Sequence, residues 1–365
     1  MRLISPILLC ISIIIICGQV FTSGSYAMDT GEERGHIVLG QQYYASGKLQ
    51  QAIYEFSAVL ERPQAVLYKE DAVYWLGEAY LKSGDLENAL NCFEQVIEQY
   101  PNGKYIVFAY YSKGWALLKL GDFIQAVKAF EKIVYDFKDD KLAPESLFKT
   151  GECLYKSGSL LRALSQLNAF LSRYPTSELS PAAYYYLGQV QYQLGRFDEA
   201  INSFNRAIDF SSNEEYSSLA VYAKSLTYIK AGKFNQAVSA LDEFEKKYPK
   251  ESLKDEILFR RGQIYFDQQN YAKAINSFEQ LIDIYPDSKW VDDSYLYKAD
   301  ALFYIGKYDL AAIWYGNLIK IFPESGLVAK AFYGMASIKF KQGSLADALR
   351  ISGNLRAAPM MRIRR

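Results

Sequence analysis

The sequence contains a single histidine, His36, among its 365 residues. Protein metal centres usually combine several histidine, cysteine or carboxylate ligands, and no second histidine or close cysteine pair accompanies His36. No G-x-S-x-G motif is present, and neither of the glycine-rich phosphate-binding motifs, G-x-x-x-x-G-K-[ST] and G-x-G-x-x-G, occurs. We therefore expect a protein that has no metal or nucleotide cofactor and is not an enzyme.

The chain also lacks an excess of charge of either sign. Its 41 Lys and Arg residues balance 41 Asp and Glu residues, so the formal net charge is zero. Because binding to nucleic acid relies on an excess of positive charge, we expect no nucleic-acid partner.

Cysteine is scarce, with four residues in the whole chain. Cys10 and Cys17 lie within an apolar N-terminal segment, and only Cys92 and Cys153 remain beyond it. Two cysteines so far apart do not form a disulfide framework. Cys153 occupies a position that is small and apolar in most repeats, so we expect it to be a buried packing residue.

Only one long apolar run is present, at the very start of the chain. Arg2 precedes an apolar run over 7–16, and small residues at Ser25 and Ala27 follow it. This pattern is typical of a secretory signal peptide over 1–27, cleaved after Ala27, with a short lead at 28–32. The alternative is an uncleaved membrane anchor, because 3–20 approaches the length that spans a bilayer. Lipid attachment is disfavoured because Leu9 and Ile16, rather than small residues, precede the two cysteines.

Aromatic residues are abundant, with 31 Tyr and 21 Phe, and such a bias is typical of internal repeats. Alanines recur at a constant spacing of 37 residues: Ala52, Ala89, Ala126, Ala163, Ala200, Ala237, Ala274, Ala311 and Ala348. Five residues before each alanine stands a glycine, except for Gln269 in the seventh unit. Twelve residues before each alanine stands a small residue, Gly, Ser or Ala. The sequence therefore predicts nine repeats without insertions.

The residues that recur at the same position of each repeat predict one helical hairpin per repeat. Apolar residues at helical spacing, such as Val73 and Leu76, indicate a first helix that ends at a glycine such as Gly84. A second helix follows, and the small residues Gly77 and Ala89 allow the two axes to approach closely. The second helix ends where proline follows an aromatic residue, at 100–101, 174–175, 248–249, 285–286 and 322–323. Because one hairpin cannot bury its apolar faces alone, the hairpins must stack into an all-α solenoid.

These residues resemble the tetratricopeptide repeat family: the small residue, the aromatic residue or Leu three positions later, the turn glycine, the alanine and the closing proline. The resemblance covers about 33–355 and implies a right-handed superhelix of about nine hairpins that binds proteins or peptides in a concave groove. The ninth repeat is degenerate, because Ser352 takes the place of an aromatic residue, and a basic tail follows at 356–365.

The 37-residue period adds three residues to the family's usual 34. This variant looks like the repeats of two groups of bacterial envelope proteins, the Tol-Pal-associated cell-division coordinator and the outer-membrane barrel-assembly lipoprotein. The present chain departs from both, since it has neither an N-terminal coiled coil nor a good lipidation site. The resemblance implies a scaffold of the periplasm or outer membrane.

The helix dipole explains two sets of charged residues that recur at the same position in several repeats. The acidic pairs at 70–71, 255–256 and 292–293 occupy the predicted start of the first helix, where negative charge is favourable. Lys82, Lys119 and Lys156 stand near its end, where positive charge is favourable, and they also border the inner groove. The acidic pairs are therefore expected to cap helices rather than to act as a glycosidase-like acid and base.

One aromatic residue per repeat is the candidate contact for a partner. In the resembled family this column lines the groove, and here it holds Tyr74, Tyr111, Phe148, Tyr185, Tyr222 and Phe259, with Trp115 close by. Together with Lys82, Lys119 and Lys156, these rings are our candidate partner-binding groove. The alternative is that the rings pack inside their own repeats, as aromatic residues commonly do. The groove columns lack the Lys and Asn of the carboxylate clamp, so recognition of an acidic C-terminal tail is not indicated.

The sequence therefore favours an exported, non-enzymatic scaffold of the bacterial cell envelope that mediates protein–protein interactions. Two alternatives stay open: a membrane-anchored subunit of an envelope assembly or secretion complex, and a non-catalytic remnant of a solenoid-bearing peptidoglycan enzyme.

Overall fold

A computed structural model of the chain describes residues 31–62, 66–210, 214–248 and 253–354. The expected signal peptide, its cleavage site and the basic tail at 356–365 lie outside the described residues. The described residues form eighteen α-helices and one short 3₁₀ helix, without a strand. The prediction of an all-α fold is confirmed, and none of the helices in these ranges is both long and apolar enough to cross a membrane.

The chain divides into two compact units, the first ending at Leu120 and the second beginning at Gly121. The helices of the first unit are α2 (Gly31–Ala45), α3 (Leu49–Leu60), η1 (Val66–Tyr68), α4 (Lys69–Ser83), α5 (Leu86–Gln99) and α6 (Ile106–Leu120). The second unit is larger and holds α7 (Phe123–Asp136), α8 (Ala143–Lys156), α9 (Leu160–Arg173), α10 (Ser180–Gln193), α11 (Phe197–Asp209), α12 (Glu214–Lys230), α13 (Phe234–Lys247), α14 (Lys254–Asp267), α15 (Tyr271–Ile284), α16 (Val291–Tyr304), α17 (Tyr308–Ile321), α18 (Val328–Lys341) and α19 (Leu345–Asn354).

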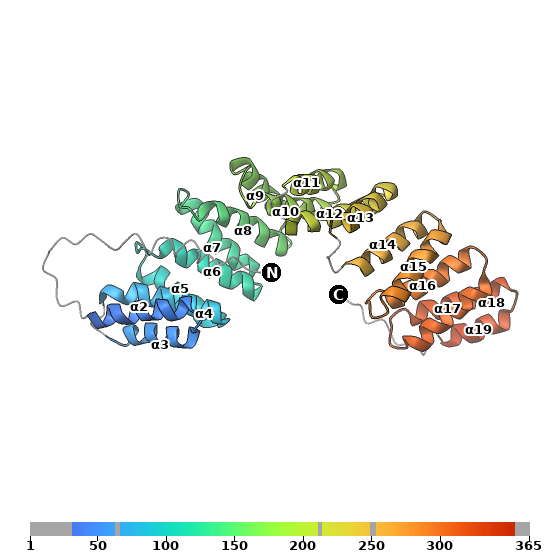
Figure 1. The fold of residues 1–365 in the computed structure, drawn as a ribbon, viewed down its shortest axis with the longest axis horizontal. Helices are drawn as coiled ribbons and strands as arrows, with labels where there is room; N and C mark the ends of the chain where they lie inside the picture. Colours follow the sequence, from blue (N-terminus) through green and yellow to red (C-terminus); the bar gives the residue numbers. More distant parts are fainter. Residues whose placement is uncertain (1–30, 63–65, 211–213, 249–252, 355–365) are drawn as a thin grey trace. The chain divides into compact units, whose positions relative to one another are not determined.

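Within each unit, every α-helix packs against the next one along the chain (Figure 1). We call the even-numbered helices A helices and the odd-numbered helices B helices, since they are the first and second helices of the predicted repeats. Most successive A helices within a unit, such as α8 and α10 or α16 and α18, also contact each other. This arrangement is an α-solenoid, as the sequence predicted.

The turn between the A and B helices has a left-handed residue in every repeat. Its φ angle is positive at Gly47, Gly84, Gly121, Gly158, Gly195, Gly232, Gly306 and Gly343. The seventh repeat has Gln269 in this place, with a φ of 59°. Glycine adopts this conformation without steric cost, whereas Gln269 must adopt it against its Cβ atom.

Close packing of the two helices depends on the small residue of the A helix. A Cβ atom added to Gly77 would lie 2.7 Å from the ring of Phe93 on α5. Phe93, Ala89 and Val96 are completely buried. The predicted close approach of the A and B helices is therefore present, with the aromatic ring of the B helix seated on the glycine.

Most B helices end at an aromatic residue. Tyr100, Tyr174, Tyr248, Tyr285 and Phe322 each follow the last helical residue and donate a backbone hydrogen bond to the carbonyl four residues earlier. The ninth repeat also forms its hairpin, with Ala348 buried and Ser352 half-buried on α19. The degenerate ninth repeat therefore retains the helical fold.

Candidate functional site

Each A helix has a side that points away from its B helix. On α8 this side carries Lys149, Glu152 and Lys156, which lie two residues before, one after and five after Gly151. At about 100° per residue, these positions are roughly 100–160° around the helix from the glycine that faces the B helix. We call this side the A-helix face. Its other members include Trp75, Glu78 and Lys82 on α4, Ser112, Trp115 and Lys119 on α6, Tyr186, Gln189 and Gln193 on α10, and Arg260 and Gln263 on α14.

Hydrogen bonds join the A-helix faces of neighbouring repeats. The Ser112 hydroxyl donates to Glu78, and the Tyr186 hydroxyl donates to Oε1 of Glu152 at 3.1 Å. In the seventh repeat Nε2 of Gln263 donates to the hydroxyl of Tyr297 at 3.2 Å. In each case the partners are 34 residues apart. Polar side chains on the A-helix face of one repeat therefore form hydrogen bonds with the A helix of the next repeat.

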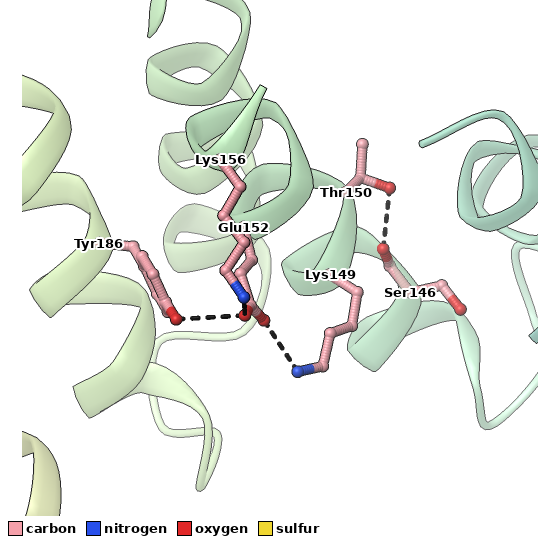
Figure 2. A network of polar contacts seen from close by, with 6 residues as sticks. All are labelled: Ser146, Lys149, Thr150, Glu152, Lys156 and Tyr186. Atoms are coloured by element: carbon pink, nitrogen blue, oxygen red, sulfur yellow. Dashed lines mark hydrogen bonds and ion pairs between the residues drawn. The ribbon is translucent and has the colours of Figure 1, made fainter. Parts of the chain in front are cut away.

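Glu152 is the centre of a polar cluster on this face (Figure 2). Its carboxylate accepts from Nζ of Lys149 at 2.8 Å, from Nζ of Lys156 at 2.7 Å and from the Tyr186 hydroxyl. Burial opposes ionisation of Glu152, but the two ammonium groups outweigh it and lower the pKa of the carboxyl group. Glu152 is therefore ionised and holds both lysines in place.

Glu78 occupies the same column in the first unit and has the opposite electrostatic environment. It is buried, and its neighbours are mainly hydroxyl groups, from Ser112, Tyr44 and Tyr74. Burial raises the pKa of the Glu78 carboxyl group, and these hydrogen bonds offset only part of the rise. Glu78 and Glu152 therefore occupy the same position in their repeats, but the pKa values of their carboxyl groups are shifted in opposite directions.

The predicted aromatic column lies mostly inside the fold. Tyr74, Tyr111, Phe148 and Phe259 are buried, with exposed fractions of 6%, 2%, 2% and 1%. Tyr185 and Tyr222 are half-buried. The groove interpretation of the four buried rings is not supported, because their surfaces are already covered; the structure favours the alternative of packing.

Tyr74 and Phe259 are each covered by an aromatic residue 31 positions later, at the start of the next A helix. Tyr105 stacks on Tyr74 with ring centroids 4.3 Å apart, and Trp290 stacks on Phe259 at 4.6 Å. The guanidinium group of Arg260 lies 4.9 Å from the Trp290 ring. This covering column was missed by sequence reasoning, although its large apolar residues recur every 37 positions: Tyr68, Tyr105, Leu142, Leu179, Tyr216, Leu253, Trp290 and Leu327.

The remaining predicted site residues are more accessible. Trp115 is half-buried and contacts Tyr111 edge to face, while Lys82, Lys119 and Lys156 are exposed. Nζ of Lys82 donates to the carbonyl of Tyr44, near the end of the preceding A helix, at 3.0 Å. The structure thus separates the buried rings from the lysines, which belong to the A-helix face.

The acidic pairs do start the A helices, but they also contact the next repeat. Oε1 of Glu70 accepts from the backbone N–H of Tyr105 at 2.9 Å. The Ser288 hydroxyl donates to Asp255 at 2.6 Å, and the Ser325 hydroxyl donates to Asp292 at 2.7 Å. The helix-capping prediction was incomplete: these carboxylates fasten the linker of the following repeat, between 33 and 35 residues away.

The other candidates for chemistry are occupied or inert. Nδ1 of His36 lies 2.6 Å from Glu55, and Nε2 lies 3.3 Å from Arg62. Cys92 and Cys153 are buried free thiols, and burial raises the pKa of both, to about 11 for Cys92 and about 12 for Cys153. The described ranges contain no group of three or more potential metal ligands.

Comparison with solved structures shows the same fold. A tetratricopeptide repeat protein from Parabacteroides merdae matches with a TM-score of 0.50 and 19% sequence identity, over 74% of this chain and 94% of that one. The C-terminal part of a repeat-containing protein from Cytophaga hutchinsonii matches with a TM-score of 0.55 and 18% identity, over 67% of this chain and 94% of that one. The sequence matches no curated protein.

Two family models, both described as tetratricopeptide repeat, match the sequence. One matches residues 111–178, 157–215 and 222–289, and the other matches residues 69–134. Together they cover more than half of the chain, and the protein therefore belongs to the tetratricopeptide repeat family.

Proposed function

We propose that this protein is an exported scaffold of the bacterial cell envelope, in the periplasm or at the outer membrane, which binds segments of other proteins on its A-helix face. Tetratricopeptide repeats are protein-interaction modules, and this chain consists largely of them. Its N-terminal apolar run supports export, and the resemblance of its 37-residue repeat to envelope scaffolds supports the compartment.

The observation that supports this proposal is the set of polar side chains on the A-helix face. Hydrogen bonds between residues 34 positions apart join the A-helix faces of neighbouring repeats, and Lys119, Lys156 and Gln193 are exposed on this face. Four of the predicted rings are covered, and Glu78, Ser112 and Glu152 are buried as well. Partner contacts therefore come from the exposed members of the A-helix face, Lys119, Lys156 and Gln193, and from half-buried Trp115. Around Glu152, two lysines face one glutamate, and the excess positive charge favours an acidic segment.

Site-specific photo-cross-linking in cells tests the binding face. A photoreactive amino acid is placed at exposed positions 119, 156 or 193 on the A-helix face. Matched controls carry it at exposed positions 128, 165 or 202 on the outer side of the B helices. We expect protein cross-links from the first set and not from the second. Cross-links from the B helices alone would refute the proposed face.

Mass spectrometry of the protein from fractionated cells tests export independently. We expect a mature N-terminus at Met28 and recovery in the envelope fraction. An intact Met1 with a membrane-bound chain would favour the anchored alternative, and a lipid on Cys17 would favour a lipoprotein.

A further inference from the structure

Helix α17 differs from the other B helices on its solvent side. Leu310, Ile313 and Ile321 are exposed there, at 47%, 55% and 52%. In the column of Leu310 the other B helices carry polar residues: Gln51, Asn88, Gln125, Arg162, Glu199, Gln236, Lys273 and Asp347. In the column of Ile313 they carry Tyr54, Asn91, Lys128, Ser165, Asn202, Ser239, Asn276 and Arg350. Aliphatic residues at both of these positions therefore occur only in the eighth repeat, while Ile321 has an exposed counterpart, Ile284, in the seventh.

Gly316 lies on the same side of α17 and is not required by the packing of the chain. A Cβ atom added there would meet nothing within 4 Å, and the residue is in the middle of the helix. Glycine weakens a helix at such a position, so its presence calls for another explanation. Because glycine has no side chain, it leaves a hollow on the helix surface that a side chain of a neighbouring helix could fill.

Two charged residues complete a straight seam on this side of the helix. Asp309, Ile313, Gly316 and Lys320 follow one another at spacings of four, three and four residues, which places them in one line. Asp309 and Lys320 are exposed, and in the described part of the chain no ion pair involves either of them.

We propose that this seam is the contact between two copies of the chain, with the two α17 helices packed antiparallel about a two-fold axis between positions 314 and 315. In this arrangement Ile313 of each copy enters the hollow at Gly316 of the other. Asp309 of each copy meets Lys320 of the other. Leu310 and Ile321 flank the seam and extend the apolar contact.

The second copy is favoured as the occupant because the seam is complementary to its own reversed sequence. In an antiparallel pair, the order Asp, Ile, Gly, Lys of one copy runs against the order Lys, Gly, Ile, Asp of the other. Each charged residue then faces a residue of opposite charge, and each isoleucine faces a glycine. A parallel pair would oppose Asp309 to Asp309 and Ile313 to Ile313, which is unfavourable for the charges. An isologous two-fold contact is also the commonest form of homo-oligomer.

A contact made by one helix from each copy is small, so the dimer is expected to form in the micromolar range and to dissociate on dilution. Sedimentation velocity of the full chain over that range tests this. We expect the sedimentation coefficient to rise with concentration for the native chain and to stay at the monomer value for Ile313→Ser. Tyr54→Ser, in the same column on α3, is the matched control and should associate as the native chain does.

Gly316→Leu separates association from folding. The new side chain fits the free monomer and favours the helix, so the melting temperature should be unchanged or higher. It fills the hollow, so the dimer should be lost. A Gly316→Leu chain that still associates would overturn the proposed pairing.

Charge reversal provides the decisive comparison. Asp309→Lys alone and Lys320→Asp alone each place like charges together twice in the dimer, so each should weaken association at least tenfold. The chain carrying both changes restores the opposite charges and should regain association. A native chain that is monomeric throughout the range, or a double variant as weak as the single ones, would overturn the proposal.

Discussion

At the scale of single residues, Glu78 and Glu152 show how the surroundings determine the pKa of a carboxyl group at one position of the repeat. Lysines surround Glu152 and lower its pKa, whereas burial among hydroxyl groups raises the pKa of Glu78. A carboxyl group with a lowered pKa contributes stability that is present above its unfolded pKa and is lost as the pH falls through its folded pKa. A carboxyl group with a raised pKa contributes stability that is present below its unfolded pKa and is lost as the pH rises through its folded pKa.

We therefore expect Glu152→Gln and Glu78→Gln to have opposite pH dependence. Glu152→Gln should destabilise the fold by about 1–3 kcal/mol at neutral pH, because partly buried Lys149 loses its carboxylate, and the loss should shrink on acidification. For Glu78→Gln, the native chain should have its greatest advantage in acid and lose it as the pH rises. Urea unfolding between about pH 2 and pH 8 measures both. Parallel pH profiles would contradict the assignment.

The aromatic column provides a second prediction at this scale. Phe259→Ala removes a buried ring that stacks on Trp290 and should cost about 3–5 kcal/mol of stability. Exposed Gln193 on the A-helix face is the control, and Gln193→Ala should change stability by less than about 0.5 kcal/mol. Thermal unfolding compares the two. A Phe259→Ala chain as stable as the native chain would show that the ring is not part of the core.

At the scale of elements, the turn of the seventh repeat carries strain that its neighbours avoid. Gln269 has a φ of 59°, where the other described turns have glycine. The left-handed conformation costs a residue with a Cβ atom about 1–2 kcal/mol, while glycine loses about 0.4–1 kcal/mol through its more flexible unfolded state. We expect Gln269→Gly to stabilise the chain by about 0.5–1 kcal/mol.

The reciprocal change, Gly306→Gln in the eighth repeat, is the control for this prediction. It places a side chain at a φ of 77° and should destabilise the chain by about 1 kcal/mol. Equilibrium urea unfolding of both variants gives the two differences. Equal effects of the same sign would show that the turn conformation does not control stability here.

At the scale of the whole molecule, the chain is a row of repeats whose contacts are mostly between neighbours. Stability in such arrays is close to a sum of local terms, so parts of the chain can unfold separately. Trp75 and Trp115 belong to the first unit, while Trp290 and Trp314 belong to the second. Tryptophan fluorescence can therefore report on each unit.

We expect the two units to unfold at different urea concentrations. A chain with Trp75→Phe and Trp115→Phe reports on the second unit, and a chain with Trp290→Phe and Trp314→Phe reports on the first. Far-UV circular dichroism of each variant, compared with the native chain, controls for the effect of the substitutions. Coincident fluorescence transitions in the two variants would contradict separate unfolding.

The periodic features of the fold could be predicted from the sequence alone. The 37-residue spacing, the turn glycines and the small residue opposite Phe93 each depend on contacts within one hairpin. Such contacts involve residues close together in the chain, so their helical spacing shows directly in the sequence. The helix ends before the prolines depend on local backbone geometry in the same way.

What required the tertiary structure was the relation between one repeat and the next. Tyr74 is covered by Tyr105, Glu152 is held by Tyr186 as well as by its own lysines, and Asp255 binds Ser288. These partners lie 31 to 34 residues apart, on helices whose relative rotation no local pattern specifies. The sequence by itself therefore determined the hairpin, the period and the all-α solenoid. Only the stacking of hairpins decided which aromatic rings are buried and which polar side chains stay available to a partner, because burial depends on the surface that the following repeat covers.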